Sequence, residues 1–195
     1  MIDNGIEQPT STNLPTKKIL LWIAMVSMIM LFGGLTSAYL VRQAEGNWLN
    51  FDLPKVFAIS TGVLLLSSVS MNFARSSAKK GNTQSLRNAL LVTLILGLTF
   101  VVLQFSGWKY LIAQNVFFAG KTANSAGSFL YVLTGLHLAH LAGGILYLMY
   151  SILVAIKNSQ TFTPKNILTI ELCAIFWHFL DGLWIYLFLF LNFAK

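Results

Sequence analysis

The stretch Ile167–Phe193, ILTIELCAIFWHFLDGLWIYLFLFLNF, combines a long apolar and aromatic run with one Glu, one His and one Asp. A helix of about 20 apolar residues crosses the hydrocarbon core of a bilayer, and this stretch is long enough to do so. Working back along the chain, the same character recurs at about 128–156, 89–110, 56–73 and 19–41. The predicted fold class is an all-α integral membrane protein, a bundle of five transmembrane helices.

The composition agrees with a chain that folds in lipid. It is 56% hydrophobic and 10% charged, whereas a typical soluble domain is about 25% charged. The net charge of +7 could indicate nucleic-acid binding, but the basic residues lie in short links and form no stripe, so no nucleic-acid partner is expected. Cys173 stands alone, which excludes a disulfide or a Cys-rich metal site. Residues 1–16 are polar and predict a flexible tail, not a signal peptide.

The distribution of Lys and Arg predicts the orientation, because short cytoplasmic loops of membrane proteins carry an excess of these residues. With the N-terminus inside, the inner segments hold Lys17, Lys18, Arg75, Lys79, Lys80, Arg87, Lys157 and Lys165. The outer segments hold Arg42, Lys55, Lys109, Lys121 and Lys195, and the first outer loop also carries Glu45 and Asp52. We therefore expect the N-terminus inside and the C-terminus outside.

A few polar side chains fall at membrane depth, where an ionisable group usually has a partner or a task. They are Gln104, His137, His140, Glu171, His178 and Asp181. With a rise of about 1.5 Å per residue, His140 and Asp181 lie at matching depths in antiparallel helices. We expect these two side chains to pair and Glu171 to lie near the inner interface, where water or a lipid head group reaches it.

Three interpretations of these residues differ in chemistry. A metal site needs three or four convergent ligands, which the two histidines with Asp181 or Glu171 could supply. A haem site needs axial histidines deep in facing helices, which two histidines on one helix suit poorly. A polar network that fixes the register of the last two helices is the favoured interpretation, and contacts with lipid or protons are the remaining alternative. Helix contacts are expected at small residues, namely Gly34 with Ala38 and Gly135, Ala139 and Gly143, and packing roles are expected for Trp177 and Trp184.

Several stretches resemble subunit III of the haem–copper respiratory oxidases. The run Glu171–Phe190 resembles that family's last helix, with its Glu, its Trp-His-Phe-x-Asp core and its aromatics. The run Gly135–Gly144, GLHLAHLAGG, resembles the preceding helix. Leu31–Leu40 and Gly97–Trp108 resemble the first and third helices of the short, five-helix bacterial form. The resemblance covers the chain from about residue 17 onward.

The resemblance implies a non-catalytic subunit of a proton-pumping oxidase that reduces dioxygen to water in the bacterial inner membrane. It implies packing on subunit I, contact with subunit II and other respiratory subunits, haem and copper only in the partners, and support of proton uptake. It also implies phospholipid in a cleft between the first two helices and the rest. One position departs from the family: Ser27-Met28 replaces a Ser-Glu pair, so a role of that intramembrane carboxylate does not carry over.

Three other functions remain open at this point. A subunit III-like partner of a nitric oxide reductase would show the same sequence features. A small transporter predicts an inverted repeat or a broken helix, and neither is evident in the sequence. An integral metalloenzyme would hold its own metal ion. The electron donor, cytochrome c or quinol, is a property of another subunit.

Overall fold

Five long helices account for almost all of the structure, which is a computed structural model that describes residues 13–46, 48–49, 53–120, 124–157 and 163–194. They are α1 (Asn13–Ala44), α2 (Lys55–Lys79), α3 (Thr83–Ala113), α4 (Ser125–Lys157) and α5 (Pro164–Phe193). All five are long and apolar enough to cross a membrane, and the described residues contain no strand. The predicted all-α fold with five spans is confirmed.

The helices extend beyond the apolar runs that predicted them, because hydropathy marks only the part of a helix that faces hydrocarbon. The clearest case is α2, which continues past Phe73 to Lys79. It ends where Gly81 adopts a positive φ of 69° and Asn82 caps the next helix through its side-chain oxygen, which accepts from the Ser85 N–H. α1 begins at Asn13, within the predicted tail, and residues 1–12 lie outside the described residues.

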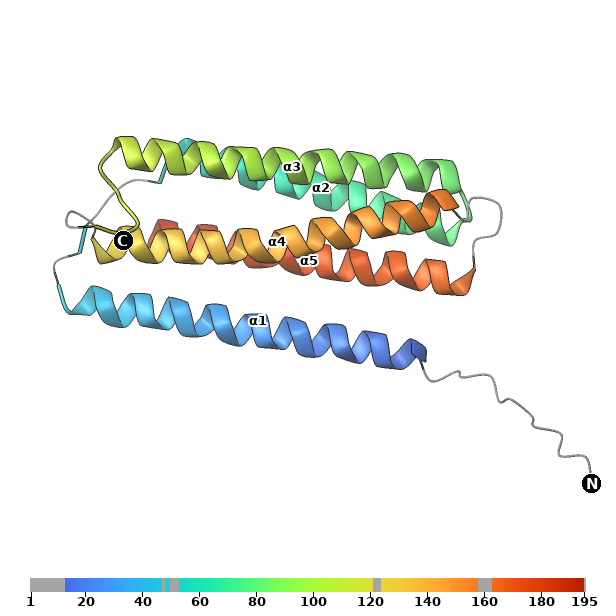
Figure 1. The fold of residues 1–195 in the computed structure, drawn as a ribbon, viewed down its shortest axis with the longest axis horizontal. Coiled ribbons are helices and arrows are strands. Elements are labelled where there is room, and N and C mark those ends of the chain that lie inside the picture. The colour runs from blue at the N-terminus through green and yellow to red at the C-terminus, as the bar shows by residue number, and fades with distance from the viewer. Residues whose placement is uncertain (1–12, 47, 50–52, 121–123, 158–162, 195) are drawn as a thin grey trace, which may run out of the picture.

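Four helices form the bundle and the first lies along its side. α2 packs on α3 and α5, and α4 packs on α3 and α5, whereas α1 contacts only α4 and α5 (Figure 1). The resemblance implied a phospholipid cleft between the first two helices and the rest, but α2 packs within the bundle and not on α1. α2 belongs to the bundle because hydroxyl and small residues along one face, including Ser60, Ser67 and Ala74, are fully buried.

The two ends of the bundle differ in charge. The end that carries the α2–α3 and α4–α5 connections also holds the start of α1, while α5 finishes at the opposite end (Figure 1). We call the first the basic end, and it is defined by Lys17, Lys18, Arg75, Lys79, Lys80, Arg87, Lys157 and Lys165.

Of the glycines that the sequence predicted at helix contacts, Gly135 lies against Trp108 of α3, 3.8 Å from where a Cβ would lie, but the tightest contacts occur at other glycines. Gly34 and Gly143 are exposed, with nothing within 4 Å of where a Cβ would lie. The close contacts are at Gly97, where a Cβ would come within 2.8 Å of Trp177, and at Gly107, where it would come within 2.8 Å of Phe57. Gly144 is equally close to α5, because a Cβ there would come within 2.8 Å of Leu180. The glycines that matter are those that face a large buried side chain of a neighbouring helix, which leaves no room for a methyl group.

Candidate functional site

The polar residues of α5 meet α2, at a cluster formed by Ser68, Asn72, His178 and Asp181, which we call the Ser68 cluster. The Ser68 hydroxyl donates to Asp181 Oδ2 at 2.6 Å, and the same Ser68 oxygen lies 2.8 Å from His178 Nδ1. On the other side of the imidazole ring, Nε2 lies 3.2 Å from Asn72 Oδ1. Four side chains from two helices thus form one continuous hydrogen-bonded chain.

The solvent exposure of these side chains falls along the hydrogen-bonded series, from Asn72 to Asp181. Asn72 is exposed and His178 is partly buried, whereas Asp181 is only 3% exposed. Asp181 Oδ1 has no hydrogen-bond partner among the described residues. Asn72 lies about 10 Å along α2 from its end at Lys79. The cluster therefore runs from the side of the bundle nearer the basic end towards the middle of the span.

An ion-paired carboxylate lies on the same helix pair, closer to the basic end. Glu171 Oε1 is 3.3 Å from Lys79 Nζ and 3.9 Å from Arg75 Nη2. All three side chains are at least partly exposed to solvent, and Glu171 is the least exposed at 22%. Glu171 therefore lies near the start of α5, towards the basic end, and its position at a membrane interface stays a prediction. An exposed pair of this kind contributes at most about 1 kcal/mol to stability.

The predicted pair of His140 and Asp181 is wrong. His140 Nδ1 lies 2.8 Å from the carbonyl oxygen of Leu136 one turn earlier, and its ring packs on Phe32 of α1 at 5.7 Å between centroids. Depth alone suggested the pair, but the two side chains point to different neighbours. Asp181 faces α2, whereas His140 faces α1.

His137 and Gln104 are buried in other interfaces. His137 is fully buried between aromatic rings, with centroids 5.1 Å from Trp184 and 6.1 Å from Phe100. Neither of its ring nitrogens has a hydrogen-bond partner among the described residues. Gln104 Nε2 donates to Ser60 Oγ at 2.9 Å, which joins α3 to α2. The six polar residues singled out in the sequence thus lie in several separate interfaces instead of one network.

The α2 hydroxyl groups accept hydrogen bonds from buried tryptophans of α5, a role that the sequence analysis did not predict. The indole N–H of Trp177 donates to Ser67 at 3.0 Å, and that of Trp184 donates to Thr61 at 3.0 Å. Both indoles are fully buried, as their predicted packing role requires. The hydroxyls also bond back to their own helix. The spacing did not reveal these pairs, because Thr61 and Ser67 are six residues apart whereas the two tryptophans are seven apart.

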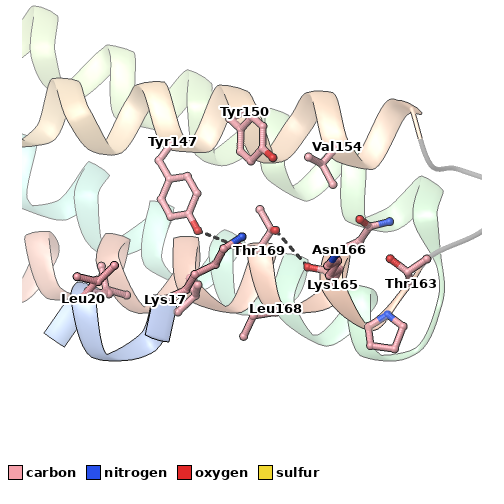
Figure 2. Close-up of a pocket in the computed structure, with 13 residues that line it drawn as sticks. Lys17, Leu20, Tyr147, Tyr150, Val154, Thr163, Lys165, Asn166, Leu168 and Thr169 are labelled. Atoms are coloured by element: carbon pink, nitrogen blue, oxygen red, sulfur yellow. Dashed lines mark hydrogen bonds between the residues drawn. The ribbon is translucent and has the colours of Figure 1, made fainter. Parts of the chain in front are cut away.

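A cavity of about 890 Å³ opens at the basic end between α1, α4 and α5. Lys17 extends towards Tyr147, and Lys165 contributes from the start of α5 (Figure 2). The Tyr147 hydroxyl donates to the Thr169 carbonyl at 3.4 Å. Apolar side chains such as Leu20 and Leu172 complete the wall, and none of the described residues that line the cavity is acidic. The cavity thus combines two ammonium groups with an apolar wall.

The metal-site interpretation has no matching geometry in the described part of the chain. No group of three or more His, Cys, Asp or Glu side chains there is placed to hold a metal ion. The arrangement offers two other kinds of chemistry. The Ser68 cluster can hold and pass protons, and the cavity can bind an anion that carries an apolar part.

Comparison with known proteins places the chain in a family. Residues 49–194 match the family model for cytochrome c oxidase subunit III. A probable cytochrome c oxidase subunit 3 of Nocardia farcinica is 30% identical, over 98% of this chain and 92% of that protein. A cytochrome bo(3) ubiquinol oxidase subunit 3 of Pseudomonas aeruginosa is 30% identical, over 86% of this chain and 79% of that protein.

The similarity extends to a longer animal relative. The cytochrome c oxidase subunit 3 of Rattus norvegicus is 33% identical over 67% of this chain, and the matched part is 47% of the rat protein. The Nocardia relative matches this chain over 92% of its own length, and five helices long and apolar enough to span a membrane form the structure. This multi-pass membrane protein therefore belongs to the cytochrome c oxidase subunit III family, a component of terminal oxidase complexes.

Proposed function

We propose that the chain is the non-catalytic third subunit of a bacterial terminal oxidase that reduces dioxygen to water and pumps protons. The observation that carries this proposal is the family match over residues 49–194, supported by relatives that align along almost the whole chain. Haem and copper belong to the partner subunits. The named relatives include subunits of both a cytochrome c oxidase and a ubiquinol oxidase, so the electron donor is a property of the assembly.

In this proposal the subunit packs on oxidase subunit I in the bacterial cytoplasmic membrane and stabilises the complex. The support is the large amount of apolar surface on all five helices, for example Met30 at 73% and Phe73 at 70% exposed. Membrane helices offer such surface to lipid and to other helices. The basic end faces the cytoplasm, because Lys and Arg concentrate on that side of membrane proteins.

The roles of the polar residues follow from where each lies. Gln104, His178 and Asp181 join α2 to its neighbours and fix the register of the bundle. His137 and His140 fill aromatic interfaces of α4, and Glu171 anchors the inner end of α5 to α2. Support of proton uptake by this subunit has to depend on residues other than the position of Met28, which carries no carboxylate.

We further propose that the cavity of Figure 2 binds a phospholipid with its phosphate near Lys17 and Lys165. Basic residues close to the inner membrane surface attract anionic lipid, at about 1 kcal/mol each. The test is native mass spectrometry of the oxidase with Lys17→Gln plus Lys165→Gln, compared with Lys80→Gln plus Lys157→Gln. We expect the first pair alone to lose bound lipid, and equal retention by both pairs would refute the site.

The proposed accessory role is tested by depleting this chain from the purified oxidase. We expect the remaining complex to keep its haem spectrum and its initial oxygen consumption per haem, but to inactivate faster during turnover or heating. Adding the chain back should restore the lifetime. Immediate loss of all oxygen reduction with haem still in place would contradict a non-catalytic role.

A further inference from the structure

The hydrogen bonds of the Ser68 cluster limit where its protons can be. With the Asn72 amide oriented as in the structure, Oδ1 can only accept, so His178 Nε2 carries a proton and donates to it. The Ser68 hydroxyl has one proton but contacts both Asp181 Oδ2 and His178 Nδ1. It therefore donates to one of these atoms and accepts a hydrogen bond from the other.

Two arrangements satisfy this constraint with the same number of protons. In the first, His178 Nδ1–H donates to Ser68 and Ser68 donates to Asp181, so that an imidazolium faces a carboxylate. In the second, the Nδ1 proton has moved to the Ser68 oxygen and the Ser68 proton has moved to Asp181 Oδ2. His178 and Asp181 are then both neutral, and no proton has been gained or lost.

The surroundings of Asp181 favour the neutral arrangement. Its side chain is buried, and Oδ1 has no partner among the described residues. An ionised carboxylate with an unpaired oxygen at membrane depth is costly, whereas a neutral acid leaves unpaired only a carbonyl-like oxygen.

Arg75 of α2 acts on His178 by charge repulsion, which disfavours the imidazolium and so also favours the neutral arrangement. The remaining charged and titratable groups on the surrounding helices contact other residues. On α2, Arg75 and Lys79 are paired with Glu171. On α4, His137 and His140 contact Phe100, Trp184 and Phe32, and on α1 the Tyr39 hydroxyl donates to the Ala194 carbonyl. Tyr186 of α5 shares a hydrogen bond with Thr36 of α1. Among the described residues, the side chain of Asp181 hydrogen-bonds to Ser68 alone.

We propose that the Ser68 cluster is an intramembrane proton-binding site. Asp181 holds one proton as a carboxylic acid, Ser68 relays protons between Asp181 and His178, and the partly exposed His178 exchanges them with water on the side of Asn72. Exchange starts from the imidazolium–carboxylate arrangement, in which His178 gives one proton to water and takes another from it. The return to the neutral arrangement then passes a proton through Ser68 to Asp181, so the number of protons and the net charge are unchanged. The inference concerns the chain itself and does not depend on the accessory role proposed above.

Infrared spectroscopy of the purified oxidase complex, with this subunit in place, tests the proposal. We expect a carboxylic-acid C=O band at neutral pH that shifts in D2O and disappears in Asp181→Asn. Asp181→Glu should restore an acid band at a different frequency, which keeps the assignment testable if Asp181→Asn assembles poorly. Glu171→Gln is the matched control and should leave the band intact, because Glu171 is ionised in its pairs with Lys79 and Arg75.

The relay makes a separate prediction about rate. In Ser68→Ala the acid should remain, but its exchange with D2O should slow by about tenfold or more, which corresponds to about 1.4 kcal/mol in the barrier. Ser70 lies on the same helix as Ser68, but its hydroxyl donates to the Ala89 carbonyl of α3. Ser70→Ala should therefore exchange at the wild-type rate. The proposal is overturned if Asp181→Asn retains the whole band, or if Ser68→Ala exchanges as fast as the wild type.

Discussion

At the scale of single residues, the hydroxyl groups of α2 carry a large part of the specificity of the bundle. Ser67 donates to the carbonyl of Leu64 and accepts from the Trp177 indole, and Thr61 does the same with Phe57 and Trp184. Each hydroxyl thus donates one hydrogen bond and accepts another, so that the buried indole N–H has a partner. Such pairs allow large rings to pack deep in the membrane without an unpaired N–H.

Trp177→Phe should lower the stability of the assembled oxidase by at least about 1–2 kcal/mol, because the hydrogen bond to Ser67 is lost and the smaller phenyl ring leaves part of the buried indole's space empty. Ser67→Ala should cost a similar amount, since it leaves the buried indole N–H unpaired. The double variant should cost less than the sum, because both changes remove one interaction. Thermal denaturation of the four forms gives this cycle, and strict additivity would show that the bond contributes nothing.

Gly97→Ala should destabilise the bundle by about 1–3 kcal/mol through overpacking. The added methyl would lie 2.8 Å from the Trp177 ring, which is itself fully buried. Gly143→Ala is the matched control, because nothing lies within 4 Å of its Cβ position. Equal melting temperatures for the two variants would mean that the α3–α5 contact is looser than described.

The sequence identified the unusual polar residues but not their partners. Depth along a helix follows from residue number, so His140 and Asp181 were placed at similar levels. The direction of a side chain relative to neighbouring helices depends on how each helix is rotated, and no spacing within one helix reveals it. Asn72 and Ser68 were missed because one amide and one hydroxyl in an apolar run are common and usually unimportant.

At the scale of helices, α1 is attached differently from the other four. It contacts only α4 and α5, and its buried side chains include Met25, Phe32 and Tyr39. Its polar links to α5 are few: the Thr36 hydroxyl lies 2.9 Å from the Tyr186 hydroxyl, and Tyr39 donates to the Ala194 carbonyl at 3.0 Å. We therefore expect α1 to be the helix that separates first.

Replacing Thr36 by Val and Tyr186 by Phe should loosen α1 selectively. Both changes keep the volume of the side chain but remove the hydroxyl pair, at a cost of about 1 kcal/mol. Hydrogen exchange of the complex, read by mass spectrometry of its peptides, should increase in α1 and stay unchanged in α2 and α3. Faster exchange throughout the bundle would contradict a peripheral attachment of α1.

Sequence patterns predicted the number of helices and their type, because each apolar run must cross the membrane as a helix. Their packing was predicted less well. The spacing of Gly34 with Ala38 marks a face that is exposed in the structure, since small residues permit close approach but do not require it. The contacts at Gly97 and Gly107 depend on aromatic rings from other helices, which the local sequence does not show.

At the scale of the whole molecule, the difference in charge between the two ends predicts which end faces the cytoplasm. Lys80 lies at the basic end and Lys109 lies near the opposite end of α3, and both are exposed. The native Cys173 is buried, so it provides a low background for thiol labelling. In intact cells, an impermeant maleimide should label Lys109→Cys and spare Lys80→Cys, and the reverse pattern would invert the proposed topology.

The central claim is that this chain is a subunit of a terminal oxidase whose redox centres lie in other subunits. The most direct measurement is affinity purification through this chain from its native membrane, with haem and metal quantified in the complex and again in this chain after it is separated. We predict a complex that contains haem and copper and consumes oxygen, and a separated chain that contains neither. Haem or copper retained in proportion to the separated chain, or a purified assembly without an oxygen-reducing subunit, would contradict the account.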